Sequence, residues 1–314
     1  MADQRISDGS DPERATQYLT ELQHVKTNER SLFDAVAYDA VYIDEGQDFC
    51  EEDFCLLKEL CRTVEGGEPN LYVFYDDAQN LLGRKRPNWQ SLGLNVRGSR
   101  AFIMTECFRN TRQIVEPAFN VLYGSFATGG SEVPPKEFGD IATLQEKGLI
   151  ENKEGVWIVK FTKRDGLVPS ISLAADKVQE ADLLIARLRY LIEEQQVRPE
   201  DIQVLSYYRQ RAQQLADAIQ KANLSSVSGI HLAFEEQDNL LGRKGYLTLS
   251  TVASAKGYDA YCILLASVNE FDRDITGRAT FYVGCTRAIE YLEVFAYEKK
   301  GLVLEMEAAL ARIG

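Results

Sequence analysis

Residues 40–48 read AVYIDEGQD, and this stretch sets the expectation for the fold. Its apolar beginning predicts a short buried strand, and Asp44 and Glu45 follow directly at the strand's carboxyl end. Residues 71–77 read LYVFYDD and repeat the pattern of an apolar run that ends in acids. Ligands of parallel sheets bind at the carboxyl ends of the strands, so both acid pairs are expected to mark the chemistry.

Helices and strands are predicted to alternate along the chain outward from these two runs. Helical spacing is found at 51–64, 112–122, 178–195 and 212–222, and further strands are expected at 101–105, 156–161, 202–207, 247–251, 262–266 and 291–296. Residues 1–15 are expected to be disordered, residues 16–36 to form one or two helices, and residues 124–155 to form loops. This alternation predicts an α/β fold with mainly parallel sheets.

The composition is that of a globular protein of 314 residues, which is long enough for two domains. A net charge of −13 argues against a protein that coats DNA by bulk charge, although a local groove for a single strand stays open. No run approaches the roughly 20 apolar residues of a membrane helix. The polar, acidic start has no signal-peptide pattern, so we expect a cytoplasmic protein that makes no contact with a membrane.

The cysteines are expected to be reduced thiols. The six of them form no CxxC pair and the chain has only two histidines, which argues against a zinc site. They are Cys50, Cys55, Cys61, Cys107, Cys262 and Cys285.

Six short strings follow one another in a fixed order. They are VYIDEGQDF (41–49), VFYDDAQNLLG (73–83), MTECFRNTRQIV (104–115), IQVLSYYRQRAQQLADAI (202–219), YLTLSTVASAKGYDAYCILL (246–265) and ATFYVGCTRAIEYLEVF (279–295). This succession resembles motifs II to VI of the UvrD/Rep family of superfamily 1 DNA helicases. The resemblance implies two RecA-like domains of the P-loop NTPase type: an incomplete first domain at 1–108 and a second domain at 109–314.

The resemblance also implies an ATP site. Asp44 matches the acid that binds Mg²⁺, and Glu45 matches the acid that activates the attacking water. Gln79 matches the glutamine that senses the γ-phosphate, while Arg109 and Arg287 match two arginines that stabilise its charge. The phosphoryl-transfer transition state spreads charge over its equatorial oxygens, which is why such a site needs cations.

The fifth motif is implied to couple the nucleotide to DNA. Thr251, Ser254 and Lys256 match residues that contact the DNA backbone, and Gly257 matches a nucleotide-binding position. Asp259 stands where the family has a glutamate, which is one methylene longer, and is expected to face the nucleotide as well.

A basic loop follows the third motif. Residues 83–89 read GRKRPNW, where the family has an aromatic residue that stacks on a DNA base. We expect Arg84 or Trp89 to stack in its place, with Lys85 beside them. The alternative is a solvated basic loop.

The phosphate-binding loop of the family is missing, since no G-x-x-x-x-G-K-[ST] string occurs in the sequence. We therefore expect a C-terminal fragment or split subunit of an ATP-dependent translocase on single-stranded or partly duplex DNA. ATP and Mg²⁺ would bind productively only if an upstream chain or segment supplied the loop. The alternative is a non-enzymatic scaffold that binds DNA or protein. Without the strand of that loop, the first domain is expected to keep an uncovered sheet face unless residues 1–39 or another chain fill the gap.

Overall fold

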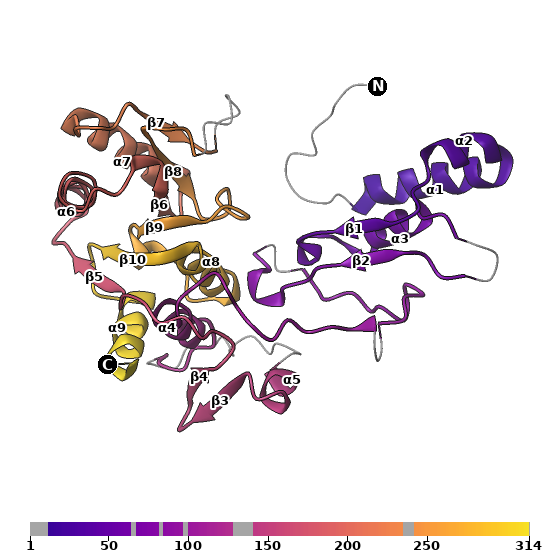
Figure 1. Ribbon diagram of the computed structural model, residues 1–314, viewed down its shortest axis with the longest axis horizontal. Coiled ribbons are helices and arrows are strands. Elements are labelled where there is room, and N and C mark those ends of the chain that lie inside the picture. Colours follow the sequence, from indigo (N-terminus) through magenta and orange to yellow (C-terminus); the bar gives the residue numbers. More distant parts are fainter. Residues whose placement is uncertain are drawn as a thin grey trace. The chain divides into compact units, whose positions relative to one another are not determined.

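The chain divides into two compact units, Met1–Ile103 and Met104–Gly314, in the computed structural model. The structure describes residues 12–63, 67–81, 84–96, 100–127, 141–234 and 242–313 (Figure 1). The sequence analysis set the domain boundary at 108/109, and the assignment of the units as RecA-like domains stays a prediction. Most of the stretch expected to be disordered, residues 1–11, lies outside the described residues. Residues 12–15 are helical instead and form the start of the first helix, which begins at Pro12.

Unit 1 is a small α/β layer. Its elements are α1 (Pro12–Asn28), α2 (Arg30–Val36), β1 (Val41–Ile43), α3 (Glu51–Glu59) and β2 (Leu71–Val73). The two strands are parallel and pair in the register Val41↔Leu71. Ile43 and Phe54 are buried where α3 covers one face of this sheet. Helix α1 packs against α3 and α2.

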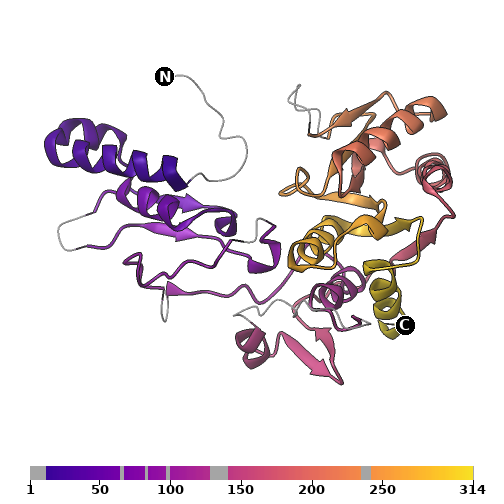
Figure 2. The ribbon, with the colours of Figure 1, turned by 180° about the vertical axis from the view of Figure 1, so that it is seen from behind.

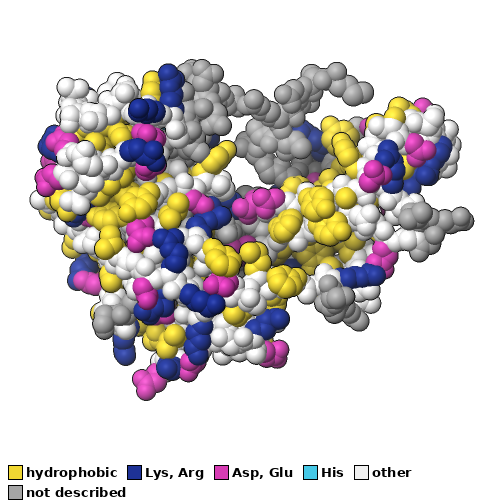
Figure 3. All heavy atoms as spheres, in the orientation of Figure 1, with side chains coloured by type: hydrophobic (Ala, Val, Ile, Leu, Met, Phe, Trp, Pro, Cys, Tyr) yellow, Lys and Arg dark blue, Asp and Glu magenta, His cyan; other side chains and the backbone are white. Residues whose placement is uncertain are grey.

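The other face of the β1–β2 sheet is exposed, as the sequence analysis expected. Tyr42, Tyr72 and Phe74 are 67%, 49% and 56% exposed, and the two tyrosine rings stack with centroids 4.7 Å apart. Figure 3 shows hydrophobic side chains gathered over β1 and β2. Since α1 packs on α3, residues 12–36 do not fill this gap.

Two predictions in this region need correction: one helix is shorter than expected and one strand is not formed. The helix predicted at 51–64 ends at Glu59, because the backbone of Leu60 and Arg62 bonds to Tyr38 instead. Residues 101–105 form no strand, because they cross the boundary between the units and pair with no described strand. Their Phe102 side chain is 86% exposed, whereas a strand of a parallel sheet is buried.

Unit 2 is built on a six-stranded, fully parallel sheet of order β5-β10-β9-β6-β8-β7, which confirms the predicted parallel α/β architecture. Its strands are β5 (Ser170–Leu173), β6 (Ile202–Ser206), β7 (Gly229–Leu232), β8 (Tyr246–Thr251), β9 (Ala260–Leu265) and β10 (Ala288–Ala296). Its helices are α4 (Arg112–Leu122), α5 (Ile141–Glu146), α6 (Lys177–Arg189), α7 (Arg209–Ala222), α8 (Ile275–Thr286) and α9 (Leu302–Ile313).

Helices cover both faces of this sheet (Figures 1 and 2). On one face α6 and α7 pack through Leu184, Leu188 and Leu215 against the apolar side chains of β6, β8 and β9. On the other face α8 contacts β9 and β10, and α4 packs behind α8. Burial on both faces explains why the run CILL of β9 is continuously apolar, as central parallel strands are.

Several elements of unit 2 differ from the prediction. The loops predicted at 124–155 contain α5 and β3 (Ile150–Lys153), although 128–140 lie outside the described residues. Strand β3 forms an antiparallel hairpin with β4 (Val156–Val159), so the strand predicted at 156–161 is apart from the main sheet. Glu154 and Gly155 both have positive φ at this turn, which is typical of tight hairpins.

Besides α5 and β3, four further regular elements were not predicted, namely β5, β7, α8 and α9. Helix α8, with the sequence ITGRATFYVGCT, is the most instructive. Two glycines and several β-branched residues give it a weak helix propensity, and its residues 277–286 are all buried. Tertiary packing therefore determines its conformation. Among the described residues, no helix is long and apolar enough to cross a membrane.

Candidate functional site

Three of the residues singled out in the sequence meet in unit 2. The Nε atom of Arg109 lies 2.7 Å from Oδ2 of Asp259, and Nη1 of Arg287 lies 3.3 Å from Oδ1 of the same carboxylate. We call Arg109, Asp259 and Arg287 the arginine cluster. One aspartate thus bridges two arginines that are distant in the sequence.

Asp259 is positioned by the connection between β8 and β9. Thr251 ends β8, and its Oγ1 lies 3.0 Å from Oγ of Ser254 and accepts a hydrogen bond from the Ser254 backbone N–H. Half-buried Lys256 follows, and then Gly257, whose φ of +85° is a conformation that favours glycine. The connection delivers Asp259 directly before β9 begins.

Arg287 is fixed by its place at the end of α8. Its side chain is 2% exposed, and Nε is 3.4 Å from the carbonyl of Val283 one turn earlier. A cation is favourable at this end of a helix because the terminal carbonyls carry partial negative charge. The backbone of Arg287 also accepts a hydrogen bond from Ala260 N–H at 3.0 Å, which ties it to the residue after Asp259.

Arg109 lies on the segment before α4, and its side chain is 48% exposed. Its backbone carbonyl accepts a hydrogen bond of 2.8 Å from Nη1 of Arg164, which pairs in turn with Glu290. The backbone of Arg109 is therefore anchored, while its side chain pairs with Asp259 and remains about half exposed to solvent.

The arginine cluster has two positive charges and one negative charge. Burial raises the pKa of Asp259, and the attraction of Arg287 and Arg109 offsets this only in part. Two oxygens of a phosphate group can accept hydrogen bonds from two N–H donors of one arginine, as the two oxygens of a carboxylate do. The geometry can therefore hold a phosphate oxyanion where the Asp259 carboxylate lies, or beside it.

The cluster lies at the opposite end of the strands from the one expected. Asp259 and Arg287 precede β9 and β10, so they stand at the amino ends of these strands. In strand β6, Ser206 pairs with Thr251 and Ile202 pairs with Cys262. Thr251 therefore lies near the carboxyl ends of the strands. At about 3.3 Å per residue, Thr251 and Asp259 are separated by roughly 20 Å along the sheet.

The acids predicted in unit 1 form a second group. Asp44 and Glu45 follow β1, and Oδ1 of Asp44 accepts a hydrogen bond of 2.9 Å from the Glu45 N–H. Glu45 adopts the left-handed conformation with φ 51° and ψ 43°. Gly46 is needed next, because a Cβ there would lie 2.6 Å from a methyl group of Val73.

Gln47 connects the turns that follow β1 and β2. It is 1% exposed, its Nε2 donates to Oε2 of Glu45, and its Oε1 accepts from the Asp76 N–H at 2.9 Å. Oδ2 of Asp76 accepts a 2.7 Å bond from Nε2 of Gln79. The predicted residues Glu45 and Gln79 thus belong to one hydrogen-bonded group. The sequence analysis missed Gln47, although an amide inside an acidic turn was a usable signal.

Asp44 suits a weakly held Mg²⁺. It is exposed, and its Oδ2 accepts no hydrogen bond from the described residues. Magnesium is commonly held by one or two carboxylates together with water and phosphate oxygens. Among the described residues no group of three or more His, Cys, Asp or Glu could hold a metal, so most ligands would come from water and nucleotide.

The basic loop of unit 1 is organised by Asn80. The Asn80 side chain donates to the carbonyl of Arg84 at 2.6 Å and accepts from its N–H at 3.0 Å. Lys85 is exposed, whereas the Trp89 ring is half-buried and packs edge-on against Phe54 with centroids 5.2 Å apart. Trp89 thus contributes to the core of unit 1, and its base-stacking role stays a prediction.

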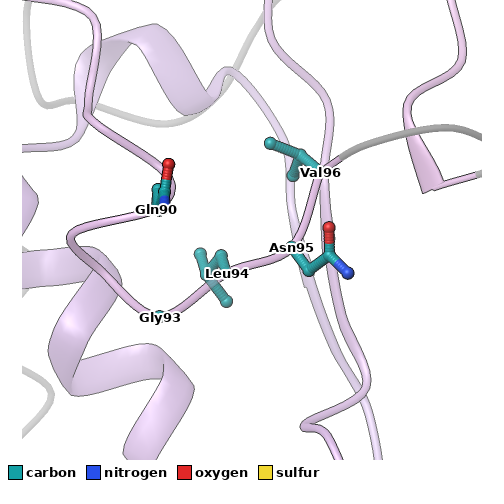
Figure 4. A pocket seen from close by; sticks show the side chains of 5 residues that line it. All are labelled: Gln90, Gly93, Leu94, Asn95 and Val96. Atoms are coloured by element: carbon teal, nitrogen blue, oxygen red, sulfur yellow. The ribbon is translucent and has the colours of Figure 1, made fainter.

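A cavity of about 280 Å³ in unit 1 contains none of the predicted site residues. Gln90, Gly93, Leu94, Asn95 and Val96 line it (Figure 4). Its lining carries no ionisable side chain, so the cavity is unsuited to a phosphorylated ligand.

The chain matches no family model and no curated protein. Among solved structures it is similar to the crystal structure of the C-terminal domain of a possible DNA helicase from Lactobacillus plantarum WCFS1. The two are 14% identical with a TM-score of 0.43, and the match covers 65% of this chain and 96% of that chain. At this level of similarity, the activity has to be argued from the residues of the chain itself.

Proposed function

We propose that the chain is part of an ATP-dependent DNA translocase of the UvrD/Rep type, in which unit 2 binds nucleotide phosphate through the arginine cluster. The observation that carries this proposal is the convergence of Arg109 and Arg287 on one carboxylate. Each arginine was assigned a phosphate role from a different motif of the sequence. Both arginines, one buried and one half-exposed, reach the same carboxylate, which has the size and charge of a phosphate edge.

The connection between β8 and β9 supports a coupling role. Thr251 and Ser254 present hydroxyl groups near its beginning, and Asp259 lies at its end, next to both arginines. The same short segment thus joins the residues proposed for DNA to those proposed for phosphate. A phosphate that displaces Asp259 from the arginines would release the end of this segment.

In unit 1 the proposal assigns Glu45 to the orientation of water and Gln79 to the sensing of phosphate. Gln47 fixes the Glu45 carboxylate by a hydrogen bond and so sets the direction in which it accepts a proton. Asp44 would help to hold Mg²⁺, and the ion would supply positive charge to neutralise the phosphates. Because the sequence contains no phosphate-cradling loop, we expect negligible ATP hydrolysis by these 314 residues alone.

The test is a titration with a fluorescent ATP analogue and Mg²⁺. Arg109→Ala and Arg287→Ala are each expected to weaken binding about tenfold or more, since a charge-assisted hydrogen bond contributes about 1.5–3 kcal/mol. Arg112→Ala is the matched control for Arg109, because Arg112 has a similar exposure and pairs with Asp165 in the same way. Equal binding by all three variants and the wild type would exclude the arginine cluster as a phosphate site.

A second candidate function is a scaffold that binds DNA without hydrolysis. The missing phosphate-binding loop favours it. The two candidates differ in one measurement: a translocase part should show DNA affinity that changes with bound nucleotide, whereas a scaffold should not. DNA affinity that is unaffected by saturating nucleotide and lost in Thr251→Ala would favour the scaffold.

A further inference from the structure

Asn110 lies between the two segments that carry the arginines. Its Nδ2 donates hydrogen bonds to the carbonyls of Thr286 at 2.7 Å and of Ala288 at 2.6 Å. Its side chain is buried, with 4% of the residue exposed. These carbonyls belong to the residues directly before and after Arg287, so the backbone on both sides of that arginine is tied to the neighbour of Arg109.

The backbone around Asn110 is itself held in place. Its carbonyl accepts a 2.8 Å hydrogen bond from Oγ1 of Thr162, and the preceding carbonyl, that of Arg109, accepts from Arg164. Cys107 N–H donates to Phe161 at 2.7 Å, which adds a third link to the same neighbouring segment. These bonds hold the backbone of Asn110 in place, and its side chain in turn holds the backbone around Arg287.

Few side chains can make this connection. A primary amide on a short side chain offers two N–H donors from one nitrogen, and both are used here. Serine offers one donor, and an ionised aspartate offers none and would repel both carbonyls. The geometry thus depends on the identity of the residue, and its size alone is not enough.

We propose that Asn110 is the positioning residue of the arginine cluster, which holds Arg109 and Arg287 at the spacing where both reach one oxyanion. The assignment of that oxyanion as a nucleotide phosphate rests on the function proposed above. The competing explanation is that Asn110 only caps the last carbonyls of α8, as side chains at helix ends do. That explanation predicts a loss of stability without a specific effect on the arginines.

Asn120 provides a matched control in the same unit. It is 1% exposed, and its Nδ2 also donates to two carbonyls, those of Glu116 at 2.9 Å and Trp157 at 2.8 Å. The first bond lies within α4, the second joins α4 to β4, and neither involves any of the three cluster residues. Asn110→Ala and Asn120→Ala should therefore lower the urea midpoint to a similar extent.

The experiment compares the two variants with the wild type by two further readouts. In ¹H–¹⁵N NMR spectra of the ligand-free chain, the Nε–H signal of Arg109 reports its pairing with Asp259, and that of Arg287 reports the order of its side chain at the Val283 carbonyl. Titration with inorganic tripolyphosphate reports anion binding. We expect Asn110→Ala to shift both arginine signals and to lower tripolyphosphate affinity about tenfold, a small misplacement effect by the standards of active sites. Asn120→Ala should leave both readouts unchanged.

Asn110→Ser keeps one donor and provides the test if the alanine variant does not fold. It should give intermediate arginine signals and an intermediate affinity. The proposal is overturned if a folded Asn110 variant keeps the wild-type arginine signals while it loses stability as Asn120→Ala does. If Asn110→Ala disorders the arginine signals but the wild type binds no tripolyphosphate, positioning by Asn110 stands and the proposed phosphate function fails.

Discussion

The two units support their candidate groups in different ways. In unit 1 the acidic turn follows a two-stranded sheet with one exposed aromatic face, and the hydrophobic cluster beneath that sheet has three buried members among the described residues, Ile43, Phe54 and Leu92. In unit 2 the arginine cluster lies at the amino ends of two inner strands, β9 and β10, of a six-stranded sheet that helices cover on both faces. Motifs that are equally clear in a sequence can thus stand on cores of very different size. The precision of a site depends on the core that supports it.

The largest expected effect comes from the core of unit 1. Phe54→Ala removes a fully buried ring from a small cluster, so it should cost about 3–5 kcal/mol and unfold unit 1 while unit 2 remains folded. The two tryptophans make this measurable, because Trp89 lies in unit 1 and Trp157 in unit 2. In a Trp157→Phe background the fluorescence of unit 1 should be that of an unfolded chain, whereas the Trp89→Phe background should show an intact urea transition.

Phe295→Ala is the control for that experiment, since Phe295 is also fully buried but lies in the large core of unit 2. It should shift the unit 2 transition and leave unit 1 unaffected. A single transition shared by both fluorophores in every variant would contradict independent stability of the two units.

Native-state hydrogen exchange should reveal the next largest difference. The amides that join β1 and β2, including Phe74 N–H bonded to Ile43, should exchange at least about 100-fold faster than those of β6 and β9. The reason is that opening a two-stranded sheet exposes little buried surface. Equal protection of both sheets would show that unit 1 has support beyond its own described residues.

Gln47 should have a moderate effect. Gln47→Leu keeps the volume but removes both amide hydrogen bonds and leaves the Asp76 N–H without this partner, which should cost unit 1 about 2 kcal/mol. Gln79→Leu, which removes a solvent-exposed bond, is the control and should cost less than about 1 kcal/mol. Urea unfolding followed by Trp89 fluorescence is the measurement, and equal midpoints would contradict the linking role of Gln47.

The smallest effect concerns the pH dependence of Asp259. Because burial raises its pKa above the ordinary value of 3.8, the folded state favours the protonated form. The contribution of Asp259 to stability is therefore fully present below about pH 3.9 and is lost as the pH rises through the raised pKa. Relative to Asp259→Asn, the wild type should lose stability across this window. Urea unfolding of both proteins between acid and neutral pH checks the sign, and a wild type that gains stability with pH would contradict it.

The sequence predicted the fold well where strands are buried on both faces. The runs that became β6, β8, β9 and β10 were recognisable because continuous apolar stretches are typical of central parallel strands. Edge strands β5 and β7 were missed because their mixed polarity resembles loops. The false strand at 101–105 shows the converse, since an apolar stretch without a neighbouring strand cannot form a ladder.

The charged residues of the two candidate groups and Gln79 were singled out in the sequence, whereas the amides of Gln47 and Asn110 were missed. Asp44, Glu45 and Arg109 stand in recognisable strings, whereas Gln47 and Asn110 act through backbone carbonyls and N–H groups. Such partners are set by tertiary structure, so an amide inside an acidic turn can draw attention to Gln47, but the sequence does not reveal which groups it bonds. The position of Asp259 at the amino end of its strand was unexpected for a related reason, because a motif does not reveal which edge of a sheet its connection reaches.

Glu45 carries a consequence for how this chain can change over evolutionary time. Its left-handed backbone is disfavoured for residues with a side chain by about 1 kcal/mol, whereas glycine adopts it freely. Selection for stability alone would therefore favour replacement of Glu45 by glycine. If the acidic turn is no longer used, related chains should lose Glu45 before they lose the neighbouring Gly46. The reason is that packing requires Gly46 to have no side chain.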